Sequence, residues 1–475
     1  MNKTLFYIVV VAALGGFLFG FDSGVISGCE KAIQVEFGLS GVWHGLVVAG
    51  ALIGTMIGVF TAGAPSDKWG RKPTLWLMAV LFLISAAGCA FTVADKAIGP
   101  HMLGWFRFIG GLAIGGVSVV VPLYIVELSP GHLRGRLVGV NQLNIVIGIV
   151  VSYISNYMVA RWMATDGHWF NQLCISLAEC FASTEMSVEM VKWRVMLGME
   201  CLPIILFMAL LVTIPESPRW LVRVNRADDA RNVLNSIGYP EVEKTIEDIK
   251  TSLTAAGTEK SDASRLFQRR YLKPICLAFF IAFFNQMSGI NAINYYTPRI
   301  FEMIFGAGSE MVSLISTIGI GVINLIFTCI SFFIIDRFGR RVLIIGGSAM
   351  MILMHALVAW QLSYGAQCNA TLAVIGIFGF IAFFAISSGA CIWVYISEVF
   401  PNVVRAKGQA LGCFTHWFLC TIVSWFFPAV VERAGTMVFA FFAFMMLLQL
   451  FWAIFIMPET KGGSIEEIEK RLGIK

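Results

Sequence analysis

Long apolar runs alternate with short polar stretches along almost the whole chain. A helix needs about 20 consecutive apolar residues to cross the hydrocarbon core of a bilayer, and twelve runs reach this length. We therefore predict twelve transmembrane helices. They cover approximately residues 5–28, 44–65, 74–93, 102–126, 137–160, 194–214, 272–302, 310–335, 342–362, 372–397, 406–430 and 437–457.

Positive charge is distributed unevenly over the segments between these helices. Lysine and arginine are concentrated after every second helix and are scarce in the opposite loops, which by the positive-inside rule places both termini in the cytoplasm. The first run contains Asp22 and lacks a small-residue cleavage site, so it is predicted to be helix 1 and not a signal peptide. The concentrated basic residues are Lys68, Arg71, Lys72, Arg134, Arg136, Arg219, Arg223, Arg337, Arg340, Arg341, Arg405 and Lys407.

The composition is typical of a membrane protein. Of 475 residues, 58% are hydrophobic and 13% are charged, against about 25% charged in soluble domains. The net charge of +5 comes from short loops and not from one face, so nucleic acid is not an expected partner. The six histidines are scattered singly and no metal-ligand spacing occurs, so we expect no metal and no other cofactor. Most cysteines fall inside predicted helices, but Cys174 and Cys180 lie in the loop between helices 5 and 6, where a disulfide is one alternative.

Three motifs occur twice in the same order. The sequence SDKWGRK after helix 2 returns as IDRFGRR after helix 8. Parallel repeats of this kind predict an all-α membrane protein with two homologous six-helix halves that rock around a midplane site. The other duplicated motifs are Glu127 with Arg134, Glu398 with Arg405, Pro215–Ser217 and Pro458–Thr460. The predicted domains are the halves 1–214 and 272–457, a cytoplasmic linker with short amphipathic helices at 215–271, and a cytoplasmic tail at 458–475.

Three charged residues lie well inside the predicted helices of the first half. Asp22 occurs in an otherwise uncharged part of helix 1, Arg107 lies in helix 4, and Glu200 lies in helix 6. A carboxylate at membrane depth costs roughly 2.5–3.5 kcal/mol on insertion scales, so it marks a functional site by default; a structural ion pair is the alternative. Arginine stays protonated, whereas an aspartate that alternately contacts Arg107 and loses it releases and takes up a proton. The three residues therefore predict proton coupling.

Charged residues also gather at the predicted cytoplasmic helix ends. Carboxylates and guanidinium groups can form bidentate ion pairs there, and pairs that bridge the two halves would form only when the cytoplasmic side is closed. The duplicated spacing favours such a latch over the alternative that these arginines only set the topology. The predicted latch residues are Asp67, Arg71, Glu127, Arg134, Arg136, Glu216, Arg219, Asp336, Arg340, Arg341, Glu398, Arg405 and Glu459.

In combination, these motifs resemble those of the sugar porters of the major facilitator superfamily, a family that includes the bacterial D-xylose–proton symporter. The resemblance extends over essentially the whole chain, and the joint occurrence of the motifs is specific. The matching stretches are Asp67–Lys72, Glu127–Arg136, Pro215–Leu221, Asn285–Asn291, Asp336–Arg341 and Pro458–Gly462.

The resemblance implies that the substrate is a sugar. A sugar is neutral and covered with hydroxyls, so its site needs amide and hydroxyl partners and aromatic faces in a desolvated cavity. Helix 7 is dense in such residues, and Gly289 within it weakens the helix and lets it bend. Motif matching implies sugar contacts at Gln142, Asn285, Gln286, Asn291, Asn324 and Trp393, with Phe19, Tyr295, Phe384, His416 and Trp417 lining the cavity.

Four positions bear on which sugar is bound. Asn285 stands where the family usually has Gln, and His416 stands where relatives have an amide. Ala390 replaces the familiar proline of helix 10, so the residue that normally interrupts this helix is missing. Ile149 matches the glucose facilitators, whereas the xylose symporter has a second Gln there. The pocket is therefore not a copy of the xylose site, and both pentoses and hexoses remain candidates.

In the relatives, an aspartate at the position of Asp22 marks the proton-driven members, and facilitators have asparagine there. We therefore expect a monomeric proton–monosaccharide symporter of the cytoplasmic (inner) membrane that works by alternating access. An uncoupled uniporter is the main alternative. A transporter-like sensor would signal through a long cytoplasmic tail, whereas only residues 459–475 follow Pro458. An enzyme would need a nucleophile–base pair or a metal site, and the sequence indicates neither.

Overall fold

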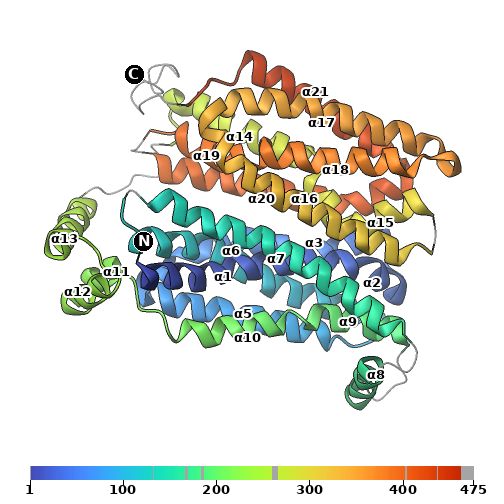
Figure 1. Ribbon diagram of the computed structural model, residues 1–475, viewed down its shortest axis with the longest axis horizontal. Helices are drawn as coiled ribbons and strands as arrows, with labels where there is room; N and C mark the ends of the chain where they lie inside the picture. Colours follow the sequence, from blue (N-terminus) through green and yellow to red (C-terminus); the bar gives the residue numbers. More distant parts are fainter. Residues whose placement is uncertain are drawn as a thin grey trace. The chain divides into compact units, whose positions relative to one another are not determined.

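A computed structural model describes residues 2–131, 133–165, 169–182, 187–258, 266–306, 308–401, 404–435 and 437–461. All regular secondary structure in these ranges is helical (Figure 1). Twelve stretches of the described chain are long and apolar enough to cross a membrane, which confirms the predicted all-α transmembrane fold. They run over Lys3–Gly28, Gly41–Thr61, Arg71–Ala90, Gly99–Leu128, Arg134–Met163, Val188–Leu211, Arg269–Phe305, Glu310–Ile335, Arg340–Ser363, Ala370–Glu398, Lys407–Ala434 and Met437–Phe455.

Three of the spans consist of two helices each. The spans without such a break are built on α1 (Lys3–Val25), α3 (Gly41–Thr61), α5 (Arg71–Ala90), α6 (Gly99–Leu128), α7 (Arg134–Met163), α16 (Glu310–Phe338), α17 (Arg340–Ser363), α20 (Arg405–Ala434) and α21 (Met437–Phe455). The broken spans are α9 (Val188–Gly198) with α10 (Cys201–Leu211), α14 (Leu272–Met287) with α15 (Ile290–Phe305), and α18 (Ala370–Ile386) with α19 (Ser388–Glu398). The sixth span breaks just before Pro203, which lacks an N–H and whose ring crowds the carbonyl group four residues earlier.

The chain forms two compact units. Unit 1 comprises Met1–Cys29, Gly50–Ser155 and Trp162–Ser261. Unit 2 comprises Glu30–Ala49, Asn156–Arg161 and Asp262–Lys475. The domain boundaries predicted from the sequence repeat stay predictions, and most of the predicted tail, residues 462–475, lies outside the described residues.

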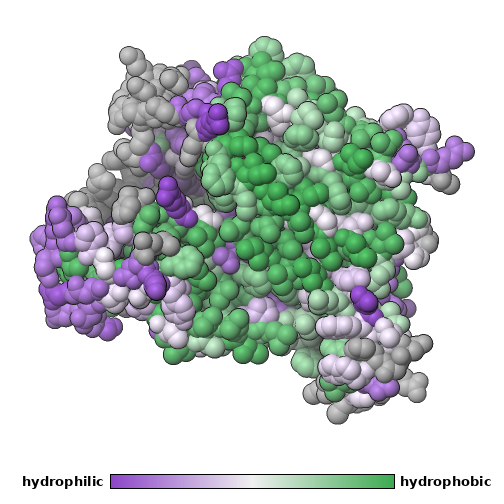
Figure 2. Space-filling model, in the orientation of Figure 1, coloured by the Kyte–Doolittle hydropathy of each residue, from purple (hydrophilic) through white to green (hydrophobic). Residues whose placement is uncertain are grey.

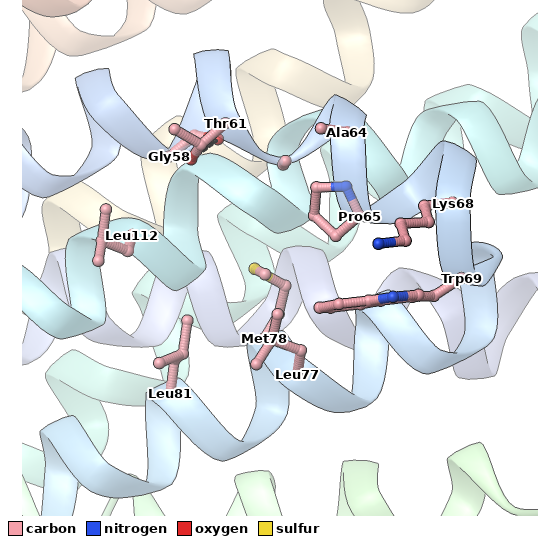
Figure 3. A pocket seen from close by; sticks show the side chains of 11 residues that line it. Gly58, Thr61, Ala64, Pro65, Lys68, Trp69, Leu77, Met78, Leu81 and Leu112 are labelled. Carbon is pink, nitrogen blue, oxygen red and sulfur yellow. Dashed lines mark hydrogen bonds between the residues drawn. The ribbon is translucent and has the colours of Figure 1, made fainter.

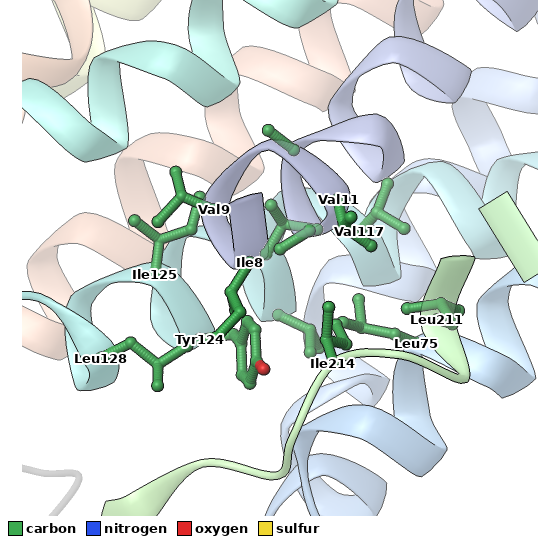
Figure 4. Close-up of a cluster of buried hydrophobic side chains, with 14 of the residues drawn as sticks. Ile8, Val9, Val11, Leu75, Val117, Tyr124, Ile125, Leu128, Leu211 and Ile214 are labelled. Atoms are coloured by element: carbon green, nitrogen blue, oxygen red, sulfur yellow. The ribbon is translucent and has the colours of Figure 1, made fainter. Parts of the chain in front are cut away.

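The core of unit 1 is formed by buried side chains of α1, α5, α6 and α10 (Figure 4). Ile8 and Val11 of α1, Leu75 of α5 and Leu211 of α10 are among the residues that pack there. Tyr124 of α6 is fully buried, and its hydroxyl donates to a backbone carbonyl at 2.6 Å, so its polar tip is paired. Because lipid tails are as apolar as leucine, close packing and hydrogen bonds hold such helices together more than hydrophobic burial does.

Glycines bring α3 and α6 into close contact within unit 1. Gly111 and Gly115 are four positions apart, so they share one face of α6. A Cβ atom at Gly111 would overlap the backbone of Ala51, and one at Gly54 would overlap the backbone of α6. This small-residue packing fixes the position of α6, the helix that carries Arg107.

Three short helices follow the sixth span, in the region where the sequence predicted amphipathic helices. Leu221, Ala230 and Ile246 of these helices are buried in the core of unit 1. Arg231 lies on the opposite, exposed surface, where it pairs with carboxylates nearby. In Figure 2 hydrophilic residues gather over α12 and α13, whereas hydrophobic residues cover the transmembrane helices. The helices are α11 (Pro218–Arg223), α12 (Ala227–Ser236) and α13 (Val242–Thr258).

Two α-helices of the described chain lie wholly outside the predicted helical segments: α2 (Glu30–Phe37) and α8 (Trp169–Ala182). Both are too short to span a bilayer, and they lie in segments that were expected to be loops. Helix α8 bears on the proposed disulfide, because it contains Cys174 and Cys180. Residues six apart in a helix are separated by about 9 Å along the axis, beyond the roughly 7 Å that a disulfide can bridge. The Cys174–Cys180 disulfide is therefore incompatible with α8, and Cys174 is a free thiol.

Candidate functional site

The seventh span is broken in the middle, as the sequence predicted from Gly289. This residue has φ +83°, in the left-handed region that glycine adopts without strain. A Cβ atom there would also collide with the ring of Phe442. The break frees the carbonyl of Ser288, which accepts a hydrogen bond from Nε2 of His355 at 3.0 Å. Because a carbonyl can only accept, Nε2 of this histidine carries the proton.

A chain of amide side chains surrounds the break. Nε2 of Gln286 donates to Oδ1 of Asn285 at 3.1 Å, and Nδ2 of Asn291 donates to Oε1 of Gln286 at 2.7 Å. Nε2 of Gln286 also lies 3.1 Å from Nδ1 of His416 on α20. Asn285, Gln286 and His416 are buried, and Asn291 is half-buried. The four side chains form one largely buried polar group in unit 2, where a neutral hydroxylated molecule can exchange its hydroxyls into the network.

Aromatic rings border this group of amides. The ring of His416 lies 4.8 Å from that of Trp393 and 5.2 Å from that of Trp417, the latter edge to face. Trp393 is 36% exposed, whereas Trp417 is buried. Tyr295 and Phe384 are also buried in unit 2. The rings offer flat apolar faces beside hydrogen-bonding groups, the combination that binds a sugar ring.

Asn324, Gln142 and Phe19 are the remaining predicted sugar contacts. Asn324 on α16 is half-buried, and its Oδ1 accepts from the Thr328 hydroxyl at 3.3 Å on the same helix. Gln142 on α7 and Phe19 on α1 belong to unit 1, and both are half-buried. Their participation in a sugar site stays a prediction.

The tenth span is broken although it lacks the family proline. Ser387, between α18 and α19, has φ −107° and ψ −92°, which is not helical. Its hydroxyl donates to the carbonyl of Phe383 at 2.6 Å, so a serine side chain competes with the helix backbone at this point. Nδ2 of Asn285 donates to the carbonyl of Ser388 at 3.2 Å and thereby joins this break to the amide chain. Replacement of proline by Ala390 therefore does not straighten helix 10.

Asp22, Arg107 and Glu200 come together inside unit 1. All three side chains are buried, and Nη1 of Arg107 donates to Oδ1 of Asp22. Glu200 lies at the break of the sixth span, within electrostatic reach of both partners. Its Oε1 has no hydrogen-bond partner among the described residues. Two carboxylates therefore share one arginine. One carboxylate can take up a proton while the other still pairs with Arg107, so no buried cation is left unpaired.

At the basic end of the helices in unit 1, Arg71 organises a cluster of charges. Its Nε and Nη2 atoms donate to the two oxygens of Glu127 at 2.8 and 2.7 Å, a bidentate pair. The hydroxyl of Ser217 donates to the same carboxylate at 2.5 Å. Glu216 accepts from the backbone N–H groups of Arg71 at 2.9 Å and Lys72 at 3.1 Å. Burial nevertheless raises the pKa of Glu216 above its ordinary value.

The same arrangement recurs in unit 2 with the duplicated motif residues. Nη2 of Arg340 donates to Glu398 at 2.9 Å, and the hydroxyl of Thr460 donates to the other oxygen of that carboxylate at 2.6 Å. Glu459 accepts from the backbone N–H groups of Arg340 and Arg341, both at 3.0 Å. The internal repeat is therefore visible in the side-chain contacts as well as in the sequence.

Among the described residues, Arg71 pairs with Glu127 inside unit 1, and Arg340 pairs with Glu398 inside unit 2. Asp67 pairs with Arg223 at 3.0 Å, and Nε of Arg405 donates to a backbone carbonyl five residues earlier. The side chain of Asp336 lies outside the described residues. The predicted pairing across the two halves stays a prediction. Three further residues of the predicted latch, Arg134, Arg136 and Arg219, are exposed and form no ion pair with described residues.

Unit 2 also contains charged contacts that the sequence did not reveal. Glu30 on α2 is buried, and its carboxylate lies 2.7 Å from Nε2 of His44 and 3.1 Å from Nη2 of Arg299 on α15. Lys31 of α2 pairs with Glu302, which lies on α15 like Arg299. These pairs hold α2 and the start of α3 against α15 within unit 2.

A groove of about 440 Å³ lies along α3, α4 (Gly63–Trp69), α5 and α6 in unit 1 (Figure 3). Leu77, Met78, Leu81 and Leu112 line it with apolar side chains, and Lys68 lies at its edge. It contains none of the predicted sugar-binding residues, and most of its lining side chains are apolar. In the described part of the chain, no group of three or more His, Cys, Asp or Glu residues is arranged to hold a metal.

Comparison with known proteins gives consistent relatives. The profile of the family described as "Sugar (and other) transporter" matches residues 8–472. The D-xylose-proton symporter of Escherichia coli K12 is 34% identical over 504 aligned residues, which cover 98% of this chain and 96% of that protein. The glucose transporter GlcP of Staphylococcus epidermidis is 34% identical over 478 residues, 99% of this chain and 98% of that protein. The solved inward-open conformation of the E. coli xylose transporter XylE superposes with a TM-score of 0.82 at 32% identity, covering 98% of this chain and 99% of that one.

Proposed function

The chain belongs to the sugar transporter family of the major facilitator superfamily, as a multi-pass protein of the cytoplasmic membrane, and from this premise we propose that it cotransports a monosaccharide with protons. The substrate is a pentose or a hexose, and the chain acts as a monomer by alternating access. The buried pair of Asp22 and Arg107, with Glu200 beside it, carries the proposal of proton coupling.

The amide chain of unit 2 supports a sugar as the substrate. Asn285, Gln286 and Asn291 hydrogen-bond one another, so each can exchange an internal bond for one to a sugar hydroxyl. Burial makes these bonds selective, because a hydroxyl missing from the ligand leaves an amide unpaired. The relatives named for xylose and for glucose support a monosaccharide without choosing between the two.

The coupling step follows from the charges in unit 1. Protonation of Asp22 removes its attraction for Arg107, and the guanidinium group then turns to Glu200, whose Oε1 is available to accept. Loss of the proton restores the original pair. Because the arginine always requires one carboxylate partner in this buried site, the proton on Asp22 controls which helices are held together.

The clusters around Arg71 and Arg340 support movement of each half as a rigid body. Each cluster fastens helices of its own unit with hydrogen-bonded ion pairs that are largely buried. The exposed arginines Arg134 and Arg136 are proposed to pair with the other half when the cytoplasmic side is closed. The closed-inside state is then favoured without any change in the sugar contacts.

Uptake of radiolabelled D-xylose, L-arabinose and D-glucose by cells that produce the protein tests this function. We expect accumulation of at least one sugar above its external concentration, and loss of that accumulation when a protonophore is added. A uniporter would instead equilibrate the sugar and ignore the protonophore. Absence of uptake of every monosaccharide tested would contradict the proposed substrate class.

A further inference from the structure

Gln449 is a buried amide in the middle of the otherwise apolar helix α21. Its side chain has no solvent exposure, and Nε2 donates to the hydroxyl of Ser388 at 3.0 Å. Oε1 of Gln449 has no hydrogen-bond partner among the described residues. A buried amide that is only partly satisfied is destabilising compared with an apolar side chain of similar size. Packing alone therefore does not account for glutamine at this position.

The partner of Gln449 lies next to the break of the tenth span. Ser388 is the first residue of α19, directly after the non-helical Ser387. The proline that interrupts this helix in relatives is Ala390 here, so the backbone has less intrinsic constraint at the break. The hydrogen bond from Gln449 holds the first turn of α19 from the neighbouring helix α21.

Ser388 connects this contact to the proposed sugar site. Its carbonyl accepts from Nδ2 of Asn285 at 3.2 Å, while Oδ1 of Asn285 accepts from Gln286 at 3.1 Å. A continuous path of hydrogen bonds and one residue's backbone therefore leads from Gln449 through Ser388 to Asn285, and onward to Gln286 and Asn291.

We propose that Gln449 is a positioning residue for sugar recognition, which acts through Ser388 on the orientation of Asn285. The inference rests on the proposed sugar-binding function. Without the bond to Gln449, the first turn of α19 shifts and the Ser388 carbonyl no longer fixes the Asn285 amide. Binding of the sugar hydroxyl that Asn285 recognises is then weakened. The hydroxyl nearer to Asn291, at the far end of the amide chain, is affected least.

Binding of D-xylose, D-glucose and their monodeoxy analogues to the purified full-length protein tests this proposal. Gln449→Leu removes the amide with little change in volume. Met446→Leu is the matched control, because Met446 is also fully buried in α21 one turn earlier and has no polar atom to lose. Thermal unfolding is measured for every variant, so that a loss of folded protein is not mistaken for a loss of recognition.

We expect Gln449→Leu to weaken binding of the better-bound parent sugar by between about twofold and tenfold, the range of one modest hydrogen bond. Asn285→Ala should lose its discrimination against one deoxy analogue. Gln449→Leu should discriminate less strongly against that same analogue. Met446→Leu should leave both the affinity and the analogue profile unchanged. A general loss of stability would instead weaken all analogues equally.

A double-mutant cycle with Ser388→Ala, which removes only one hydroxyl, tests the route of the effect. If Gln449 acts through Ser388, the double variant should bind sugar no more weakly than the weaker single variant. Additive effects, or an unchanged analogue profile in Gln449→Leu, would overturn the proposal. If Asn285→Ala itself alters no sugar affinity, the failure belongs to the proposed sugar site, and the positioning role falls with it.

Discussion

Replacement of Gln286 by alanine perturbs the centre of the amide chain. This side chain has no solvent exposure and makes three contacts, with Oδ1 of Asn285 at 3.1 Å, Nδ1 of His416 at 3.1 Å and Nδ2 of Asn291 at 2.7 Å. At about 0.5–1.5 kcal/mol for each neutral hydrogen bond, their loss should lower the free energy of unfolding by roughly 1.5–4.5 kcal/mol. The loss of one buried partner of a sugar hydroxyl should weaken binding by about 1–3 kcal/mol, roughly fivefold to 150-fold.

Sugar binding to purified Gln286→Ala, measured by calorimetry beside thermal unfolding, separates the two effects. The matched control is Gln361→Ala on α17, because Gln361 is also buried and its Oε1 accepts at 3.2 Å from the backbone N–H of Asn369, which is not a member of the amide chain. The control should lose stability and keep its affinity for sugar. Equal affinities of Gln286→Ala, Gln361→Ala and the native protein would refute the assignment of the site to helix 7.

Three further predictions concern recognition, stability and gating. His416→Asn should change the ratio of D-xylose to D-glucose affinity in competition binding while uptake stays sensitive to protonophore; loss of that sensitivity would make His416 a proton carrier. Arg71→Gln should lower the free energy of unfolding by about 3–5 kcal/mol because it leaves the buried carboxylate of Glu127 without its cationic partner. Replacement of the exposed Arg134 in Arg134→Gln should change thermal unfolding little, and similar melting shifts for both variants would contradict the role of the Arg71 cluster. Arg134→Ala or Arg405→Ala should speed the reaction of a thiol introduced in the cytoplasmic half of the cavity with cytoplasm-side reagent, and unchanged rates in both variants would leave these arginines as topology signals only.

The transmembrane architecture could be predicted from the sequence because membrane-spanning helices require long apolar runs, and those runs are unmistakable. The short helices α2 and α8 were missed, since they are too short for this test. The break at Gly289 could be predicted, because a glycine among polar residues in an apolar span weakens the helix. The break at Ser387 could not be foreseen from the missing proline, since there a local serine–backbone hydrogen bond disrupts the helix.

The sequence indicated which charged residues could pair in the candidate site, but not which side chains support its helix breaks. Pairing of Asp22 with Arg107 follows from the cost of isolated charges in a membrane. A single polar residue in an apolar helix, such as His355 or Gln449, has no partner in the sequence, and only the packing of α17 and α21 against the two breaks identifies what it holds. The relation of Gln142 to the amides of unit 2 depends on long-range packing that no local pattern contains.

Proton movement driven by sugar tests the central claim of proton–sugar symport most directly. De-energised cells that produce the protein are given a pulse of a transported sugar in weakly buffered medium, and the external pH is recorded. We predict alkalinisation of the medium with the native protein and none with Asp22→Asn, although the variant still exchanges labelled for unlabelled sugar. Sugar entry through the native protein without any pH change, or undiminished alkalinisation with Asp22→Asn, would contradict the account.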